Sequence, residues 1–459
     1  AGADYGRATS LAGQKILIEY TDPNPFKELH LGHLMSNTIG EALARLHEAA
    51  GGEVKRACYQ GDVGLHVAKA VWGMTKQGVK QTDAAAMRQL GLAYAAGARA
   101  YDEDAAARAE IERLNRSIYD RSDAEVNKRY DWGRQVSLDY FEKIYSRLGT
   151  KFDFYFFESV TAKLGQKLVE ENIDKVFERS DGAVIFRGET HGLHTRVFLN
   201  RDGLPTYEAK ELGLAPLKYE QYPYDQSLIL TANEVSEYFK VLLAALKLIF
   251  PDLAAKTKHI SHGLLRLTTG KMSSRTGQVL AAEAVLDELT ERARAKIGVR
   301  TVSDPFIVAD RIAVAAIKYS ILKQSPGRDI IFDPSQALSF EGDSGPYLQY
   351  TLVRARSVLT KAMISTTDVK RPADELPSRL ERLVHVFPEA IDGAVINLAP
   401  HSLLGYLTDM AGAFNAYYAE RPILAAGVSA AYRLQLTAVT AHILESGLTW
   451  LGLPTVDRM

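Results

Sequence analysis

Two histidines lie three residues apart in the segment PNPFKELHLGH, which runs from Pro23 to His33. His30 and His33 would share one face of a helix that begins near them. A helix N-terminus already favours an anion through its free amide hydrogens and its dipole. Gly32 carries no side chain, so a base or a ribose could approach the backbone closely. We interpret the segment as a seat for a triphosphate, where the histidines would stabilise transition-state charge.

Other interpretations of these histidines remain open. His30 and His33 could cap or pack the helix, and they could bind zinc, although no obvious third ligand accompanies them. His191 and His194 have the same spacing in HGLH, but no set of carboxylates or cysteines accompanies them at metal spacing. We therefore expect His191 and His194 to be turn or surface residues.

A second polar loop, TTGKMSSRTG, carries Lys271 and Arg275 between glycines. Fixed cations there could offset the charge that develops on a departing pyrophosphate. A basic loop of this kind is, by itself, usually only a solvated surface. If both loops serve one site, they would clamp the same nucleotide from opposite halves of one sheet.

The elements around the histidines predict a parallel sheet. KILIEY (15–20) and VKRACY (54–59) are short apolar runs typical of buried strands. Between them, apolar residues recur at helical spacing, at Leu34, Met35, Ile39, Leu43 and Leu46, and Gly51-Gly52 ends the helix. Such a unit has a right-handed crossover, and ligands of these sheets lie beyond the carboxyl ends of the strands. The histidine segment follows the first strand at that place.

The rest of the chain divides in two. Alanine and charged residues predominate over 75–128, which predicts a helical insertion within about 75–190. The segment 194–210 holds Asp202-Gly203 between two extended pieces, which predicts a hairpin, and DQSLILTA and HISHGLLRL predict further strands. Helical stripes predominate after about Val285. We therefore expect domains at 1–285 and 286–459.

Two further segments have less specific patterns. KFDFYFFES (151–159) interleaves aromatic residues with few bases, which favours core packing over a surface that stacks nucleic-acid bases. Gly61, Asp62 and Gly64 form a turn at the end of a predicted strand. That turn is as consistent with lining the site as with a structural role.

Composition bounds the class of protein. The 459 residues are 46% hydrophobic, the formal charge is −1, and Cys58 is the only cysteine. A disulfide framework is therefore excluded, and no signal peptide or apolar run of membrane length is present. These features favour a cytoplasmic protein. A neutral total charge means that any nucleic-acid binding needs a local basic surface.

Several motifs together resemble the arginyl-tRNA synthetases of class I. They are HLGH, KMSSR, EYTDPNPFKELHLGHLMSNTIGEALARL, YQGDVG, GPYLQYTLVRARS and the terminal DRM. The resemblance implies a Rossmann-like parallel-sheet catalytic domain with a helical insertion, followed by an all-α bundle of the anticodon-binding type. It also implies that ATP with Mg²⁺ adenylates arginine, that tRNA(Arg) receives the arginine and is needed for the first step, and that the protein is a monomer.

The resemblance assigns nucleotide-binding roles by position. The residues that it assigns to ATP binding are Lys27, His30, Gly32, His33, Lys271, Met272, Ser273 and Arg275. Those that it assigns to catalysis are His30, His33, Lys271 and Lys27. The usual second signature has a second lysine at the position where this chain has Ser274. Lys27, just ahead of the first signature, is the expected substitute, and Arg275 is a rival for that role.

The resemblance also assigns substrate contacts. Arginine binding falls on Glu19, Asn24, Tyr207 and Glu211, where Glu211 replaces the usual aspartate and is one methylene longer. A planar guanidinium pairs bidentately with a carboxylate, which suits this set. Binding of tRNA falls on Tyr347, Gln349, Tyr350, Arg354, Tyr418 and Met459. For Tyr347 and Tyr350, packing inside the bundle is an equal alternative.

Three hypotheses follow for function. The first is an arginine–tRNA ligase. The second is another nucleotidyltransferase, against which the long helical second half argues. The third is a tRNA-binding paralogue without catalysis, which Ser274 and Glu211 would support. Within class I, the enzymes for glutamate, glutamine and cysteine are rivals, and a single cysteine argues against the zinc-dependent cysteine enzyme. Whether an amino-terminal tRNA-binding domain once preceded Ala1 is left open.

Overall fold

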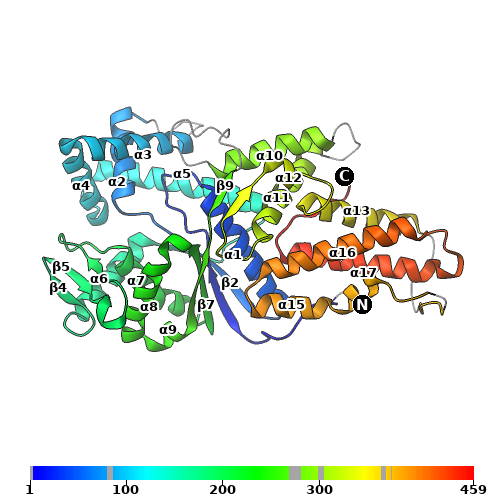
Figure 1. The fold of residues 1–459 in the computed structure, drawn as a ribbon. Helices are drawn as coiled ribbons and strands as arrows, with labels where there is room; N and C mark the ends of the chain where they lie inside the picture. Colours follow the sequence, from blue (N-terminus) through cyan, green and yellow to red (C-terminus); the bar gives the residue numbers. More distant parts are fainter. Residues whose placement is uncertain (1–3, 80–85, 268–280, 298–303, 363–368, 374) are drawn as a thin grey trace. The chain divides into compact units, whose positions relative to one another are not determined.

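The computed structural model describes residues 4–79, 86–267, 281–297, 304–362, 369–373 and 375–459 (Figure 1). The chain forms two compact units. The first comprises Ala1–Gln14, Asn37–Val54 and His262–Met459, and the second comprises Lys15–Ser36 and Lys55–Ser261. None of the described helices is long and apolar enough to cross a membrane.

A five-stranded sheet lies almost entirely in the second unit. Its strand order is β3-β2-β1-β7-β8, and β1 pairs in parallel with β7, as β2 does with β3. The strands are β1 Lys15–Glu19, β2 Glu53–Gln60, β3 Phe154–Phe157, β7 Gln226–Ala232 and β8 Thr257–His262. Helix α1 (Leu31–Ala49) connects β1 to β2, so the predicted strand–helix–strand unit is confirmed. The aromatic segment 151–159 supplies β3, whose Phe156 is buried in the core against the sheet, as predicted.

The alanine-rich segment forms helices, as predicted, wherever the structure describes it. They are α3 Ala86–Glu103, α4 Ala105–Asp120 and the start of α5 Ala124–Leu148. Helix α2 Leu65–Gln77 precedes them. Helices α2 and α3 approach so closely that a Cβ on Gly97 would collide with the backbone of Lys69, and one on Gly73 with the backbone of Ala93. These two glycines therefore let the helix backbones touch.

The substitution Gly97→Ala should lower the free energy of unfolding by about 1–3 kcal/mol, because an added methyl group must push two helix backbones apart. Gly91→Ala on the same helix is the matched control, since its Cβ would meet nothing closer than a Glu28 oxygen at 3.9 Å. That control should stabilise the protein by up to about 1 kcal/mol, the helix-propensity gain of alanine over glycine. Urea unfolding of both variants measures the difference. Equal stabilisation by the two would contradict the close approach of α2 and α3.

The predicted hairpin at 194–210 is wrong in its second half. The strand β6 (Arg196–Leu199) forms, but afterwards only Pro205 makes a bridge to Leu199, and helix α7 (Tyr207–Gln221) begins. The Asn200 side chain closes the turn by accepting hydrogen bonds from the backbone of Asp202 and Leu204. β6 instead pairs with β5 (Ala183–Phe186), which pairs with β4 (Glu178–Ser180). Good helix formers and burial against α6 (Glu158–Glu171) therefore outweigh the turn signal.

Helices α6 and α7 meet at a second pair of glycines. A Cβ on Gly165 of α6 would collide with the backbone carbonyl of Ala209 on α7, and Gly213 of α7 faces the backbone of Thr161 and Gly165. The two helix backbones are therefore in direct contact. This contact fixes the position of Lys210 and Glu211, which follow Ala209 in the chain.

The first unit is mainly helical, as predicted for the chain after Val285. Its longer helices are α10 Ala282–Ile297, α11 Pro305–Leu322, α13 Gly345–Lys361, α14 Arg379–His385, α15 Phe387–Ile396, α16 Pro400–Glu420 and α17 Ala430–Trp450. The exception is β10 (Ile330–Phe332), which pairs with β9 (Leu265–Leu267). The segment HISHGLLRL thus forms two strands, β8 and β9, in different sheets.

Candidate active site

The two signature histidines lie at the start of α1, and each ring accepts a backbone hydrogen bond. The Gly32 N–H donates to His30 Nδ1, and the His30 N–H donates to His33 Nδ1, both at 3.1 Å. The rings are stacked, with centroids 3.8 Å apart. A neutral imidazole that accepts at Nδ1 carries its hydrogen on Nε2. In each neutral ring, Nδ1 therefore accepts from the backbone, and Nε2–H remains as the hydrogen-bond donor.

Burial, followed by the nearby charge of Lys27, lowers the pKa of His30. His30 is thus a neutral hydrogen-bond donor at neutral pH. The Lys27 ammonium lies 4.2 Å from the centroid of the Tyr94 ring on α3, a contact in which the ring attracts the cation. At Gly32, a Cβ would lie 2.9 Å from His30 Cε1 and 3.0 Å from Nδ1. The missing side chain therefore leaves room for the His30 ring itself.

The loop that leads from β1 to the histidines has an unusual backbone. Thr21, Asp22 and Phe26 have positive φ angles of 79°, 45° and 69°, a conformation that side chains rarely adopt. Hydrogen bonds hold it: Tyr59 N–H donates to Asp22 Oδ1 at 2.8 Å, and Phe26 N–H donates to Ser137 Oγ at 2.8 Å. Sequence patterns gave no signal for this strain, which residues distant in the chain maintain.

Two of the predicted arginine-binding carboxylates lie close enough to interact electrostatically. Glu19 ends β1 and Glu211 lies on α7, and both are buried. Burial, then the charge of Glu19, raises the pKa of Glu211 to about 8. The same two causes raise the pKa of Asp22. Lys218 of α7, which the sequence analysis missed, donates to Glu19 Oε2 at 2.8 Å, and both side chains are only 2% exposed.

Tyr207 and Asn24 border the same region. Tyr207 begins α7, one turn before Glu211, and is 58% exposed. Asn24 lies against Gly61, where a Cβ would collide with the Asn24 side-chain oxygen. The predicted turn at 61–64 therefore abuts one predicted arginine contact through Gly61.

A buried ion pair beside Tyr207 was also missed by the sequence analysis. Lys210 donates to Glu158 Oε2 at 2.6 Å, and both side chains are almost fully buried. The Lys210 ammonium lies 4.9 Å from the centroid of the Tyr207 ring. Burial raises the pKa of Glu158, although the charge of Lys210 opposes this rise. Glu158 follows the aromatic strand β3, a strand end at which a polar residue could have been flagged.

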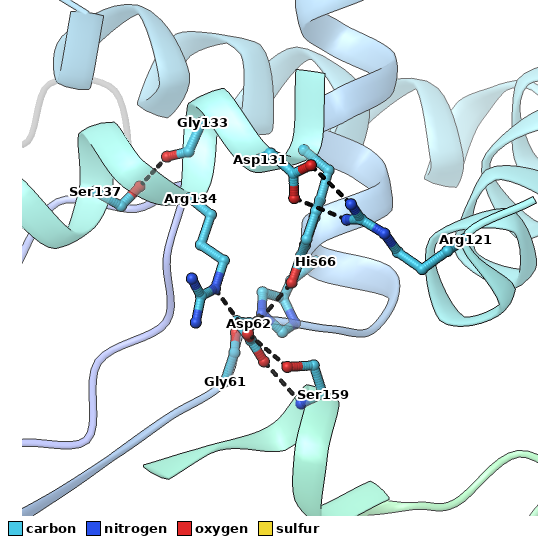
Figure 2. A network of polar contacts seen from close by, with 10 residues as sticks. Gly61, Asp62, His66, Arg121, Asp131, Gly133, Arg134, Ser137 and Ser159 are labelled. Carbon is cyan, nitrogen blue, oxygen red and sulfur yellow. Dashed lines mark hydrogen bonds and ion pairs between the residues drawn. The ribbon is translucent and has the colours of Figure 1, made fainter. Parts of the chain in front are cut away.

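Asp62 of the GDVG turn holds a network rather than facing a ligand (Figure 2). Its fully buried carboxylate accepts from Arg134 Nε at 2.9 Å and from the Ser159 N–H and Oγ–H, both at 2.8 Å. The Tyr130 hydroxyl donates to it at 3.2 Å. Asp62 thereby joins the ends of β2 and β3 to helix α5.

Some predicted residues lie elsewhere. Lys271, Met272, Ser273, Ser274 and Arg275 fall outside the described residues, so convergence of the two signatures stays a prediction. His191 ends the short 3₁₀ helix Gly188–His191 and stacks on Phe186 with centroids 5.2 Å apart, which confirms a turn residue. Within the described ranges, no group of three or more His, Cys, Asp or Glu side chains could hold a metal ion.

The first unit has a cavity of about 670 Å³ between α13 and the end of α16, lined by three of the predicted tRNA contacts. The Arg354 guanidinium lies 4.8 Å from the centroid of the Tyr350 ring and 5.3 Å from that of Tyr418. Arg354 Nη1 also donates to Asn415 Oδ1 at 2.6 Å. Tyr418 is 42% exposed. We call this cavity the Arg354 groove.

The other predicted tRNA contacts differ. Gln349 is fully buried, and its amide donates to the carbonyls of Arg311 and Pro454. The prediction that Gln349 contacts tRNA does not fit this placement, because the helical periodicity of α13 turns the residue into the bundle. The Tyr347 hydroxyl accepts a hydrogen bond from Asn415 Nδ2 at 3.0 Å, and Met459 is half-buried at the end of the chain.

Two protein families match this chain, and the residues that they match coincide only in part with the two compact units. The family described as tRNA synthetases class I (R), catalytic domain, matches residues 3–334, and the DALR anticodon binding domain matches residues 348–459. Similar proteins include the arginine–tRNA ligase of Treponema denticola, at 29% identity over 99% of this chain and 81% of the relative. That of Amoebophilus asiaticus is 30% identical over 97% of this chain and 81% of the relative.

A solved structure agrees with these matches. Arginyl-tRNA synthetase of Thermus thermophilus superposes with a TM-score of 0.80 at 27% identity, covering 99% of this chain and 84% of that chain. The predicted fold class is therefore confirmed: a parallel-sheet catalytic domain is followed by a helical anticodon-binding domain. The rival assignments to enzymes for glutamate, glutamine or cysteine do not fit these matches. This chain belongs to the class I arginyl-tRNA synthetases.

Proposed function

We propose that this arginine–tRNA ligase recognises arginine with Glu19, Asn24, Tyr207 and Glu211 and activates it beside His30 and His33. The observation that carries the proposal is a deficit of positive charge. Glu19 and Glu211 are buried and Asp22 is partly buried, and these three carboxyl groups influence one another. Among the described residues, a single cation, Lys218, acts on all three. A cationic ligand would complete this cluster, because buried charges require partners.

Arginine supplies two cations for such a cluster, its guanidinium and its ammonium group. A guanidinium forms two parallel hydrogen bonds to one carboxylate. We assign this role to Glu211, with the exposed Tyr207 ring one helical turn away. Glu19 and Asn24, at the start of the loop that leads to the histidines, would hold the ammonium end. The arginine carboxylate would then point toward α1.

Activation joins an oxygen of that carboxylate to the α-phosphorus of ATP. The bond from this phosphorus to its bridging oxygen breaks, and pyrophosphate leaves. The Nε2–H donors of His30 and His33 would stabilise the charge on the phosphate oxygens, and Lys27 would add a fixed cation. Mg²⁺ would arrive with ATP, since Mg²⁺ is usually held largely by substrate phosphates. In the second step a ribose hydroxyl of the tRNA attacks the activated carbonyl carbon, and AMP leaves.

The Arg354 groove would hold an unstacked anticodon base. Tyr350 and Tyr418 place two aromatic rings beside the Arg354 cation, and single-stranded RNA bases are recognised by stacking on aromatic rings and guanidinium planes. Arg421 and Lys361 also line the groove and would attract phosphates. We propose 286–459 as the tRNA-binding domain of the ligase.

Tyr418→Ala should reduce kcat/KM for tRNA by about 5- to 160-fold, because stacking of one base contributes roughly 1–3 kcal/mol. The KM for arginine should stay unchanged. Phe306→Ala is the control, since Phe306 is 57% exposed on α11 and does not line the groove. A tRNA fragment without the anticodon arm should be charged equally by the wild type and Tyr418→Ala. A loss that persists with this fragment would contradict the assignment.

Pyrophosphate exchange into ATP tests the function itself. We expect exchange that requires arginine and intact tRNA together. Exchange with another acid in place of arginine would indicate a different nucleotidyltransferase. Tight binding of tRNA without any exchange would indicate a paralogue that has lost catalysis.

A further inference from the structure

A second cavity lies in the second unit and has no role in the function proposed above. It has a volume of about 270 Å³, where the end of α4, the middle of α5 and the first turns of α6 meet. Its lining includes Tyr119, Arg121, Tyr130, Asp131, Arg134 and Lys163. We call it the Arg134 cavity. Its volume is slightly below that of ordinary ligand sites, which are roughly 300–1,000 Å³, so it suits a small group.

Arg134 is held rigidly at the wall of this cavity, but most of its donors are unused. Its Nε donates to the buried Asp62 carboxylate at 2.9 Å (Figure 2). Its guanidinium lies 4.0 Å from the centroid of the Phe157 ring. The side chain is only 25% exposed. Its Nη1 and Nη2 atoms donate no hydrogen bond to any residue in the described part of the chain. A fixed planar fork of this kind suits an oxyanion.

The remaining charges of the cavity favour an anion as well. Arg121 and Asp131 neutralise each other through two hydrogen bonds of 2.8 and 2.7 Å. The exposed Lys163 has no ion-pair partner among the residues described. The cavity therefore offers two cations with spare donors, and its only lining carboxylate is already paired. A singly charged group such as a phosphodiester matches this arrangement.

The cavity also adjoins the proposed arginine site. Tyr119, which lines it, lies beside Lys210, whose ammonium is 5.9 Å from the Tyr119 ring centroid and 4.9 Å from that of Tyr207. Tyr207 is one of the proposed arginine contacts. During transfer, the terminal ribose of the tRNA must reach the activated arginine. The phosphates just before that ribose must then pass close by, and a ring such as Tyr119 can stack a base.

We propose that the Arg134 cavity binds one phosphate of the single-stranded 3′ end of the tRNA, through Arg134 and Lys163. This proposal rests on the function proposed above, because it takes tRNA to be the substrate. Binding there would anchor the strand immediately before the reacting ribose. The shared chemistry is that of a phosphate group, and free inorganic phosphate is its rival source.

Lys163→Gln tests the proposal without disturbing the Asp62 network. Lys167→Gln is the matched control, because Lys167 lies one turn further along α6, is 72% exposed and does not line the cavity. The dissociation constant is measured for intact tRNA and for the same tRNA without its last four nucleotides. We expect Lys163→Gln to weaken binding of intact tRNA by roughly 3- to 10-fold and to reduce the salt slope of log Kd by about 0.7, as for one phosphate of a single strand.

Binding of the truncated tRNA should not change with Lys163→Gln, and Lys167→Gln should change neither value. The proposal is overturned if Lys163→Gln weakens both tRNAs equally or weakens neither. A further outcome also overturns it: inorganic phosphate raises the thermal midpoint of the wild type but not of Lys163→Gln, and both tRNAs bind the variant as tightly as the wild type. Wild-type charging of tRNA with arginine is measured in parallel. Its absence would refute the proposed function, whereas normal charging without an effect of Lys163→Gln would refute only this inference.

Discussion

Replacing His30 by asparagine should slow the activation of arginine by about 10²- to 10³-fold, the usual loss when one preorganised donor to developing charge is removed. The asparagine Oδ1 can occupy the place of Nδ1 and accept the Gly32 N–H, as the histidine does. Asparagine cannot replace the Nε2–H donor. The start of α1 should therefore stay intact while the proposed phosphate contact is lost. The rate of tRNA-dependent pyrophosphate exchange and the thermal midpoint measure the two effects.

Two further variants separate catalysis from folding. His30→Gln places an amide N–H near the former Nε2 position, so it should keep more activity than His30→Asn and lose more stability. His385→Asn, at an exposed position on α14, should change neither property. Full activity in His30→Asn would refute the proposed role of this ring. So would a loss of rate that is entirely explained by unfolding.

The affinity for arginine should fall about 50-fold between pH 8 and pH 6, because a carboxyl group with a pKa of about 8 is half ionised at pH 8 and only about 1% ionised at pH 6. Burial and the charge of Glu19 raise the pKa of Glu211 to about 8, so below that pH the free enzyme holds a proton there. A guanidinium requires the carboxylate, and arginine must therefore displace this proton. Above pH 8 the affinity should level off. Calorimetry in buffers of different ionisation enthalpy measures the proton released with each arginine.

The same shift predicts the sign of a stability change. The pKa of Glu211 is higher in the folded protein than in the unfolded chain, where it is about 4.3. The corresponding stability is fully present below the unfolded pKa and is lost as the pH rises through about 8. Arginine should therefore raise the thermal midpoint more at pH 9 than at pH 6.

Control variants identify the group that titrates. The charged groups around Glu211 are Glu19, Glu158 and Lys218, and Glu19 also raises the pKa of Asp22. Glu211→Gln should remove the pH dependence and leave weak binding at every pH. Glu220→Gln, at an exposed position of the same helix, should leave the pH dependence unchanged. A slope that persists in Glu211→Gln would assign the proton to Asp22 and contradict this account.

The parts of the fold that the sequence predicted share one property: a local pattern sufficed. β1, α1 and β2 follow from apolar periodicity within short windows, and the helices α3 to α5 follow from alanine-rich amphipathic repeats. The prediction of a hairpin was wrong because it used only a local turn signal, whereas the burial of α7 against α6 depends on residues distant in the chain. Tertiary contacts overrode the preference of the turn.

The candidate site divides in the same way. His30, Gly32 and His33 could be found because neighbours in the chain act together. Lys218 pairs with Glu19 across 199 residues of sequence, and Lys210 pairs with Glu158 across 52. No window includes both members of such pairs, and an isolated lysine in a sequence resembles any surface charge. The fold alone brings these partners together.

The glycine contact between α6 and α7 limits how the amino-acid preference of the enzyme can evolve. Because backbone touches backbone at Gly165 and Ala209, α7 cannot slide or tilt inward to suit a shorter ligand. A change in ligand length must instead be matched by the reach of the side chains that α7 presents. In the arginine site proposed above, the extra methylene of Glu211, relative to aspartate, would be an adjustment of this kind, made on a helix whose backbone is in contact with α6.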